Sequence, residues 1–147
     1  MMKRTLASAT AVLLLITLNT AQARDTRHML SIQDALSTPD AKAKLDGDIQ
    51  LQFGAAPKGT ITQRHGEFTA NKKTNAFNKS DTEACRWVFL SAMIALQDRA
   101  RREGGNAVVN IRSYYKKNEI NSPTEFECGA GAVMAGVTLK GEVVTLK

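Results

Sequence analysis

The chain has 147 residues, with 20 Lys or Arg against 14 Asp or Glu, and 43% of its residues are hydrophobic. This length supplies one compact core, so we expect a single domain. With only two Cys and two His, the composition excludes a zinc-finger array and a disulfide-dense toxin scaffold. No apolar run reaches the ~18 residues that a membrane-spanning helix needs.

The first 23 residues have the features of a secretory signal peptide. Lys3 and Arg4 give a basic start, residues 6–18 form an apolar segment, and Ala21-Gln22-Ala23 is a small-x-small cleavage site. The apolar segment is too short to span a bilayer stably. Without the two basic residues the net charge falls from +6 to +4, which does not predict nucleic-acid binding.

We therefore predict a mature chain that begins at Arg24 and is released into the periplasm or secreted, with no membrane span. No Cys lies near the cleavage site, so no lipid anchor is expected. Osmotic-shock fractionation followed by N-terminal sequencing should recover a periplasmic chain starting at Arg24. Recovery of uncleaved protein from the cytoplasm would contradict this prediction.

Export determines how the two cysteines, Cys85 and Cys128, are interpreted. In an oxidising compartment, a lone pair of cysteines favours a structural disulfide over a metal site or a reactive thiol. The metal alternative needs more ligands, and His28 and His65 stand alone without ligand spacing. We expect a Cys85–Cys128 disulfide and no bound metal.

One catalytic pattern and one phosphate-binding pattern can be formed from the sequence, and both are weak. A hydrolase could use Ser91, His65 and Asp98, but Ser91 falls inside a predicted helix and lacks the strand-to-helix turn of a nucleophile. Residues 129–131 read Gly-Ala-Gly without a following helix start, and no P-loop motif occurs. We expect a protein without enzymatic activity and without a cofactor.

Short elements are predicted at the start of the mature chain. Residues 24–29 are polar and are expected to be loose. Ser31 with Asp34 three residues later, and then Thr38 with Pro39, are helix-start signals, which predict two short helical turns.

The next two segments differ in the strength of their strand signals. Residues 48–53 alternate polar and apolar side chains, which predicts a strand with Ile49, Leu51 and Phe53 towards the core. Residues 60–78 show a strand signal only around Phe68 and Ala70, followed by an expected polar loop rich in Asn and Lys.

The strongest element follows this loop. Ser80 with Glu83 forms a capping box, and neither Gly nor Pro occurs before Gly104, which predicts a helix over 81–103. Its apolar residues recur at helical spacing: Cys85, Val88, Phe89, Ala92, Leu96 and Ala100.

Three cations lie close to the end of this helix: Arg99, Arg101 and Arg102. Positive charge there stabilises a helix through its dipole, so the cluster has a structural explanation. The alternative is that these three residues bind an acidic partner.

Strands are predicted after the helix. Residues 107–112 form a β-branched run, and residues 126–146 suggest one or two strands with a turn near Lys140-Gly141. The predicted fold class is α+β, with one long helix on a small mixed or antiparallel sheet, short N-terminal helical turns and one disulfide. We expect Val88, Phe89, Ala92 and Leu96 to cover strands that contain Val108, Ile111, Val133 and Val137.

Two stretches carry a family resemblance. Residues 100–112, ARREGGNAVVNIR, and residues 126–133, FECGAGAV, resemble the YbjQ-like family, in which a long helix precedes a G-[AG]-N-A-V-V strand and a strand ending in G-x-A-V. They also resemble the periplasmic domain of the stress-sensing outer-membrane lipoprotein of the Rcs phosphorelay. Residues 31–36 and 53–54 resemble small secreted proteobacterial proteins labelled excinuclease ATPase subunit.

The resemblance implies a YbjQ-like core over residues 81–139 and a periplasmic location. In the Rcs lipoprotein a Cys before the helix is disulfide-bonded to a Cys just before the last strand, and Cys85 and Cys128 fall at those two places. It also implies an interaction with another envelope protein and leaves oligomerisation open. We thus expect a non-enzymatic envelope protein, related to protein interaction or envelope stress, with a small-ligand or metal-binding periplasmic protein as the alternative.

Overall fold

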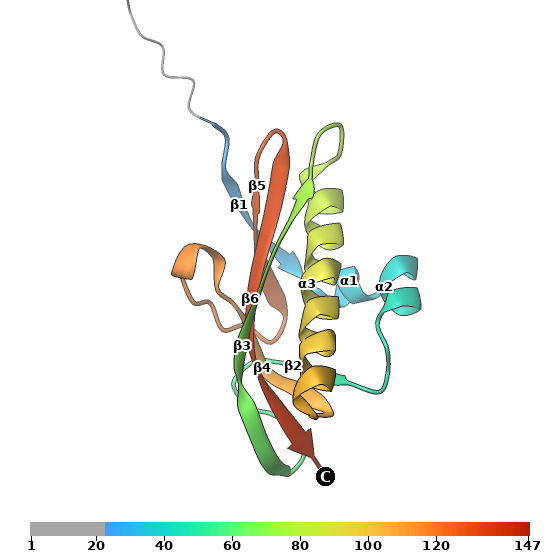
Figure 1. Ribbon diagram of the computed structural model, residues 1–147. Helices are drawn as coiled ribbons and strands as arrows, with labels where there is room; N and C mark the ends of the chain where they lie inside the picture. The colour runs from blue at the N-terminus through green and yellow to red at the C-terminus, as the bar shows by residue number, and fades with distance from the viewer. Residues whose placement is uncertain (1–22) are drawn as a thin grey trace, which may run out of the picture.

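The computed structural model describes residues 23–147, and the predicted signal peptide lies almost wholly outside this range. One long helix packs against a curled, mixed sheet of six strands, as the predicted α+β class requires (Figure 1). The elements in chain order are β1 (Thr26–Ser31), α1 (Ile32–Leu36), α2 (Pro39–Lys44), β2 (Gln50–Phe53), β3 (Ile61–Asn75), α3 (Asp81–Glu103), β4 (Ala107–Ser113), the 3₁₀ turn η1 (Tyr115–Lys117), β5 (Glu125–Ala130) and β6 (Met134–Leu146).

The C-terminal strand β6 is the centre of the sheet. One of its edges pairs with β3 from Met134 to Leu146, antiparallel throughout. Its other edge is shared, because β5 pairs with it at Gly136 and Ala135 and β4 pairs with it further along. Outside these, β1 lies antiparallel to β5 and β2 lies parallel to β4, so the sheet is mixed.

The long helix has the predicted bounds because both of its ends are specified locally. The Ser80 side chain accepts a hydrogen bond from the backbone N–H of Glu83 at 3.1 Å. Gly104 ends the helix with a φ of 81°, a conformation in which a side chain would be strained. The two short helices are also confirmed, with Ser31 and Thr38 as their N-caps.

The core lies between α3 and one face of the sheet. Phe89 is 1% exposed, and its ring stacks on that of Phe126 in β5 with the centroids 3.9 Å apart. The predicted contact partners Val108, Ile111 and Val137 are all fully buried. Val133 is the exception, since it lies in the turn between β5 and β6 and is 57% exposed.

The predicted disulfide is confirmed. The Sγ atoms of Cys85 and Cys128 are 2.06 Å apart, and the Cα atoms are 5.9 Å apart. Both residues have no exposed surface. The bond ties the first turns of α3 to β5 and so fixes the helix to the sheet at one end.

The expectation of a loose segment at 24–29 is wrong. Residues 26–31 form strand β1, because their backbone groups pair with β5 along its full length. Side chains add to this attachment: Arg24 forms two hydrogen bonds to Asp81 at 2.7 and 2.9 Å, and His28 Nε2 lies 2.8 Å from the same carboxylate. The Arg24 hydrogen bond and then that of His28 hold the pKa of Asp81 below its usual range.

Two other local expectations are also wrong. The expected polar loop after Ala70 is the continuation of β3, which reaches Asn75 because β6 pairs with it residue by residue. The expected turn at Lys140-Gly141 lies inside β6, and the turn falls at residues 131–133. A Cβ atom on Gly141 would come within 2.6 Å of a Val108 side-chain carbon, so this glycine permits close packing against β4 and does not mark a turn.

Candidate functional site

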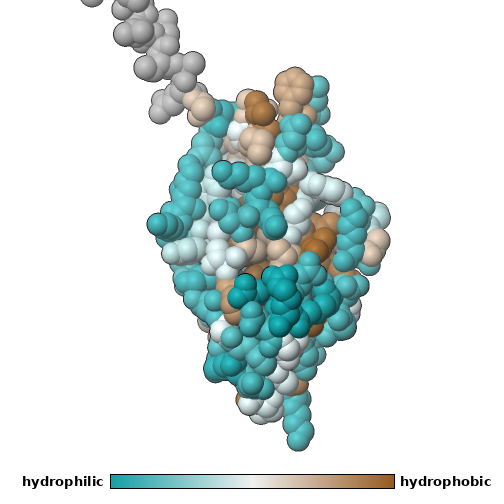
Figure 2. Space-filling model, viewed as in Figure 1, coloured by the Kyte–Doolittle hydropathy of each residue, from teal (hydrophilic) through white to brown (hydrophobic). Residues whose placement is uncertain are grey.

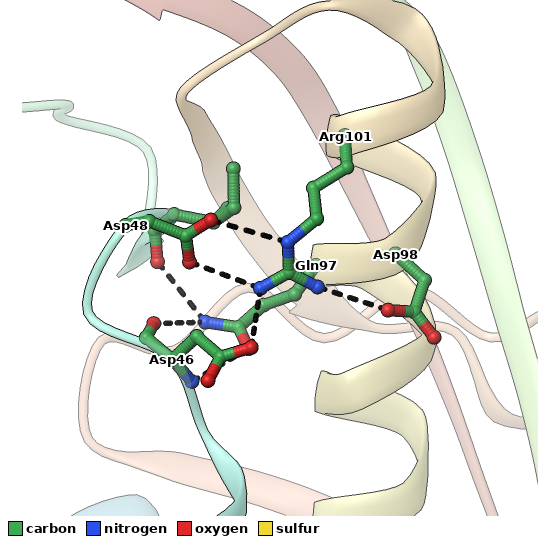
Figure 3. A network of polar contacts seen from close by, with 6 residues as sticks. Asp46, Asp48, Gln97, Asp98 and Arg101 are labelled. Atoms are coloured by element: carbon green, nitrogen blue, oxygen red, sulfur yellow. Dashed lines mark hydrogen bonds and ion pairs between the residues drawn. The ribbon is translucent and has the colours of Figure 1, made fainter.

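The three arginines predicted as partner-binding have different surroundings, and Arg101 is the most fully engaged (Figure 3). Its guanidinium donates to Asp48 at 3.2 and 3.0 Å, to Asp46 at 2.7 Å and to Asp98 at 2.9 Å. The hydrogen bond from Arg101 is the main reason that the pKa of Asp48 is lowered. Since three carboxylates already occupy Arg101, its geometry supports a structural role.

Gln97 explains why these carboxylates lie beside the helix. Its side chain is 2% exposed, and its Nε2 atom donates to the carbonyl oxygens of Asp46 and Ile49 at 2.7 and 3.1 Å. Its Oε1 atom accepts from the backbone N–H of Asp46 at 3.1 Å. Gln97 therefore supplies hydrogen-bond partners for the backbone groups of the loop before β2. Arg101 neutralises the two carboxylates of that loop, Asp46 and Asp48.

Arg99 and Arg102 face a different part of the molecule. Both line a cleft of about 430 Å³ between α3 and β3. The guanidinium carbon of Arg99 lies 3.9 Å from the centroid of the Phe68 ring, and its Nε atom is 2.8 Å from Glu103. Arg102 is exposed and makes no ion pair with any of residues 23–147.

The cleft has an apolar floor and a polar rim. Ala95 and Leu96 of α3 and Phe68 and Ala70 of β3 are buried or half-buried. The rest of the lining is polar or charged: Glu67, Thr69, Asn71, Lys72, Arg99 and Arg102. Hydrophilic side chains correspondingly gather over the face where α3 meets β3 (Figure 2). The cleft can accommodate a polar chain more readily than an apolar ligand.

One wall of the cleft is an edge strand. β3 has 15 residues and pairs only with β6, so within the described part of the chain its other edge has no strand neighbour. β1 and β2 are edge strands too, but they have six and four residues. An open edge presents unpaired N–H and C=O groups, which can pair with another extended chain.

The charged side chains of β3 divide into paired and unpaired ones. Arg64 donates to both carboxylate oxygens of Glu142 at 2.6 Å. Glu67 is 2.7 Å from Arg112 and 2.8 Å from Lys140, and these two cations, Lys140 first, lower its pKa. Lys72 has no acidic partner among residues 23–147, so it adds free positive charge beside Arg102.

The residues considered for catalysis are not brought together. His65 Nε2 lies 2.8 Å from the Thr145 hydroxyl, the Ser91 hydroxyl donates to the Trp87 carbonyl at 3.2 Å, and Asp98 accepts from Arg101. None of these hydrogen bonds links one of the three to another. Residues 23–147 also contain no group of three or more His, Cys, Asp or Glu placed to hold a metal ion.

The free edge of β3 is the feature that the sequence analysis missed. Its signal was present as alternation, since Phe68, Ala70, Lys72 and Thr74 share the face towards α3. The apolar members at this spacing number only two, so the pattern resembles a loop. The complete strand depends on β6, which begins 59 residues after β3 ends.

None of the helices within residues 23–147 has the length and apolar character required to cross a membrane. Comparison of the chain with models of protein families, with curated proteins and with solved structures finds no match.

Proposed function

We propose that the protein is a non-enzymatic, exported envelope protein that binds an extended, acidic segment of another envelope protein along β3. The observation that carries the proposal is the long free edge of β3 beside two cations, Lys72 and Arg102, that pair with no acidic residue among residues 23–147. The backbone of the bound segment would add a strand to the sheet, and its acidic side chains would meet the cations of the cleft.

The charge of the edge favours an acidic partner over a second copy of the same strand. Cationic side chains on an edge strand disfavour its pairing with an identical edge. In β3 the single carboxylate, Glu67, is already held by Arg112 and Lys140. Lys72 and Arg102 are therefore the charges that a bound segment would meet, and they select for Asp or Glu.

A role in envelope stress, which the resemblance to the Rcs lipoprotein implies, fits this mode of binding. A segment that another protein exposes only under stress could be captured by an edge strand. The disulfide is compatible with an oxidising compartment, as export requires. The periplasm is the compartment in which we place the interaction.

A labelled peptide of alternating Glu and Thr residues is a suitable probe. We expect it to bind the protein, and we expect the double variant Lys72→Glu/Arg102→Glu to bind it at least about tenfold more weakly, because two attractive contacts become repulsive. Fluorescence anisotropy measures the affinity. Amide hydrogen exchange should show new protection in β3 when the peptide is bound.

The matched control is Lys42→Glu/Lys58→Glu, which changes the net charge by the same amount at two exposed positions away from the cleft. This control should retain the affinity of the wild-type protein. Equal loss of binding in both double variants would mean that only the net charge matters. Binding without protection of β3 would exclude strand addition.

A further inference from the structure

Two loops meet at the end of the molecule opposite its C-terminus, at the top of Figure 1. These are residues 76–80, between β3 and α3, and residues 131–133, between β5 and β6. The backbone N–H of Ala76 donates to the carbonyl oxygen of Val133 at 2.6 Å, so the two loops are attached to each other.

Three large apolar side chains project from these loops and from the first residue of β6. Phe77 is 61% exposed, Val133 is 57% exposed and Met134 is 47% exposed, the highest values for large hydrophobic residues in the described chain. Figure 2 shows apolar surface at this end of the molecule. We refer to Phe77, Val133 and Met134 as the apolar tip.

The local backbone fixes Phe77 in its outward position. Its N–H donates to the Asn75 side chain at 2.8 Å, and the next residue, Asn78, has a φ of 59°. Asn is one of the few residues that adopts this left-handed conformation readily. The Lys79 ammonium also donates to the Asn75 carbonyl oxygen at 3.2 Å. The conformation of the turn therefore holds the Phe77 side chain in its exposed position.

The segments that carry the apolar tip are cationic. Residues 73–80 and 131–134 contain two Lys, Lys73 and Lys79, and neither Asp nor Glu. Two acidic residues near the tip are paired, Asp81 with Arg24 and Asp25 with Lys116, whereas Glu83 in the first turn of α3 lines a pocket with Lys79 and makes no ion pair with any of residues 23–147. Apolar side chains with cations beside them match the chemistry of an anionic lipid surface.

The size of the apolar tip argues against a second copy of the chain. A stable protein interface covers ~800 Å² on each partner. A fully covered aromatic side chain contributes only ~150–250 Å², and the apolar tip has one aromatic and two smaller side chains. Self-association through this end would also bring Lys73 and Lys79 of two copies together. Binding to a bilayer surface needs no such large area, and it does not bring the lysines of two copies together.

The chain also enters the fold at this end. The Arg24 guanidinium donates to the Gly131 carbonyl oxygen at 2.9 Å, which places the first described residues beside the β5–β6 turn. The predicted signal peptide ends at Ala23, directly before Arg24 in the sequence. Arg24 and the apolar tip therefore lie at the same end of the molecule.

We propose that the apolar tip inserts shallowly into the surface of an anionic phospholipid bilayer, with Lys73 and Lys79 against the lipid phosphates. One aromatic and two aliphatic side chains give weak, reversible attachment, unlike a lipid anchor. Lys72 and Arg102 line the cleft, whereas Lys73, the next residue of β3, lines a pocket with Val133 and Met134, so the inference rests on different side chains from the proposed function.

The test uses the mature protein, purified from periplasmic extract, and phosphatidylcholine vesicles with or without phosphatidylglycerol. Because Trp87 is the single Trp of the chain, a Trp87→Phe background makes a new Trp at position 77 the sole reporter. Phe77→Trp in this background should show a blue-shifted emission only when phosphatidylglycerol is present. Met29→Trp, at an exposed position on β1, is the matched control and should not shift.

Vesicle flotation then measures attachment. Phe77→Ser should reduce binding to the anionic vesicles by about tenfold, because one inserted aromatic side chain is lost. Met29→Ser should bind like the wild-type protein, and all variants should keep the wild-type unfolding midpoint because their side chains are exposed. Wild-type protein that does not float, or equal flotation of Phe77→Ser, would overturn the proposal. A dimer in sedimentation that Phe77→Ser abolishes would assign the apolar tip to a second copy.

Discussion

Replacing Phe89 by Ala is expected to lower the free energy of unfolding by about 3–5 kcal/mol, as large-to-small changes in a core do. Phe89 is 1% exposed, and its ring lies between Phe126 at 3.9 Å and Phe53 at 5.9 Å, measured between centroids. The substitution would leave a cavity where α3 meets the sheet. The urea midpoint, followed by circular dichroism, measures the loss.

Phe77→Ala is the matched control, because it makes the same chemical change at a position that is 61% exposed. Its unfolding midpoint should stay close to that of the wild-type protein. Arg101→Ala should also cost far less than Phe89→Ala, since the ion pairs of Arg101 are exposed and screened. Similar midpoints for Phe89→Ala and Arg101→Ala would contradict the packing described above.

Removing the disulfide with Cys85→Ala/Cys128→Ala should lower stability by roughly 4 kcal/mol in the chain-entropy model, given the sequence separation of 43 residues. The bond restricts the unfolded chain, and it joins two elements that are distant in sequence. Because both cysteines are completely buried, part of the loss would come from packing.

Urea unfolding with and without a reductant separates these contributions. Reductant should destabilise the wild-type protein and leave the double variant unchanged, because the variant has no bond to reduce. Alkylation followed by mass spectrometry should find no free thiol in protein taken from the periplasm. A wild-type midpoint that does not respond to complete reduction would refute a stabilising role for this bond.

Features encoded by neighbouring residues could be predicted from the sequence. The bounds of α3 follow from Ser80, Glu83 and Gly104, each of which acts within one helical turn. The strand at Ala107–Ser113 follows from its β-branched run. The disulfide follows from a lone pair of cysteines in a chain expected to be exported.

Features that depend on distant partners could not be predicted in this way. Strand β1 has an ordinary polar sequence, and it is a strand because β5, about 100 residues later, pairs with it. Gly141 suggests a turn in a local window, whereas its lack of a side chain in fact permits Val108 to pack closely. In β1 and at Gly141, tertiary contacts therefore override the weak secondary-structure preference of the local sequence.

The candidate site shows the same division. Spacing along the helix groups Arg99, Arg101 and Arg102 as one cationic cluster. The fold separates them, because the loop before β2 brings Asp46 and Asp48 to Arg101 while β3 forms a cleft with the other two. Which arginine remains available to a partner therefore depends on the loop before β2 and on β3, and neither can be located from the helix sequence alone.

The central position of β6 has a consequence for the order of folding. Because β6 is the last of the strands within residues 23–147, β3, β4 and β5 all lack their shared neighbour until residues 134–146 have been synthesised. Its pairing with β3 joins residues from Asn75 and Met134, 59 positions apart, to Ile61 and Leu146, 85 positions apart, and contacts so distant in sequence form slowly. A nascent chain that lacks β6 has no completed sheet on which α3 can pack. Such a chain reaches its folded state only after the strand at its C-terminal end has been made.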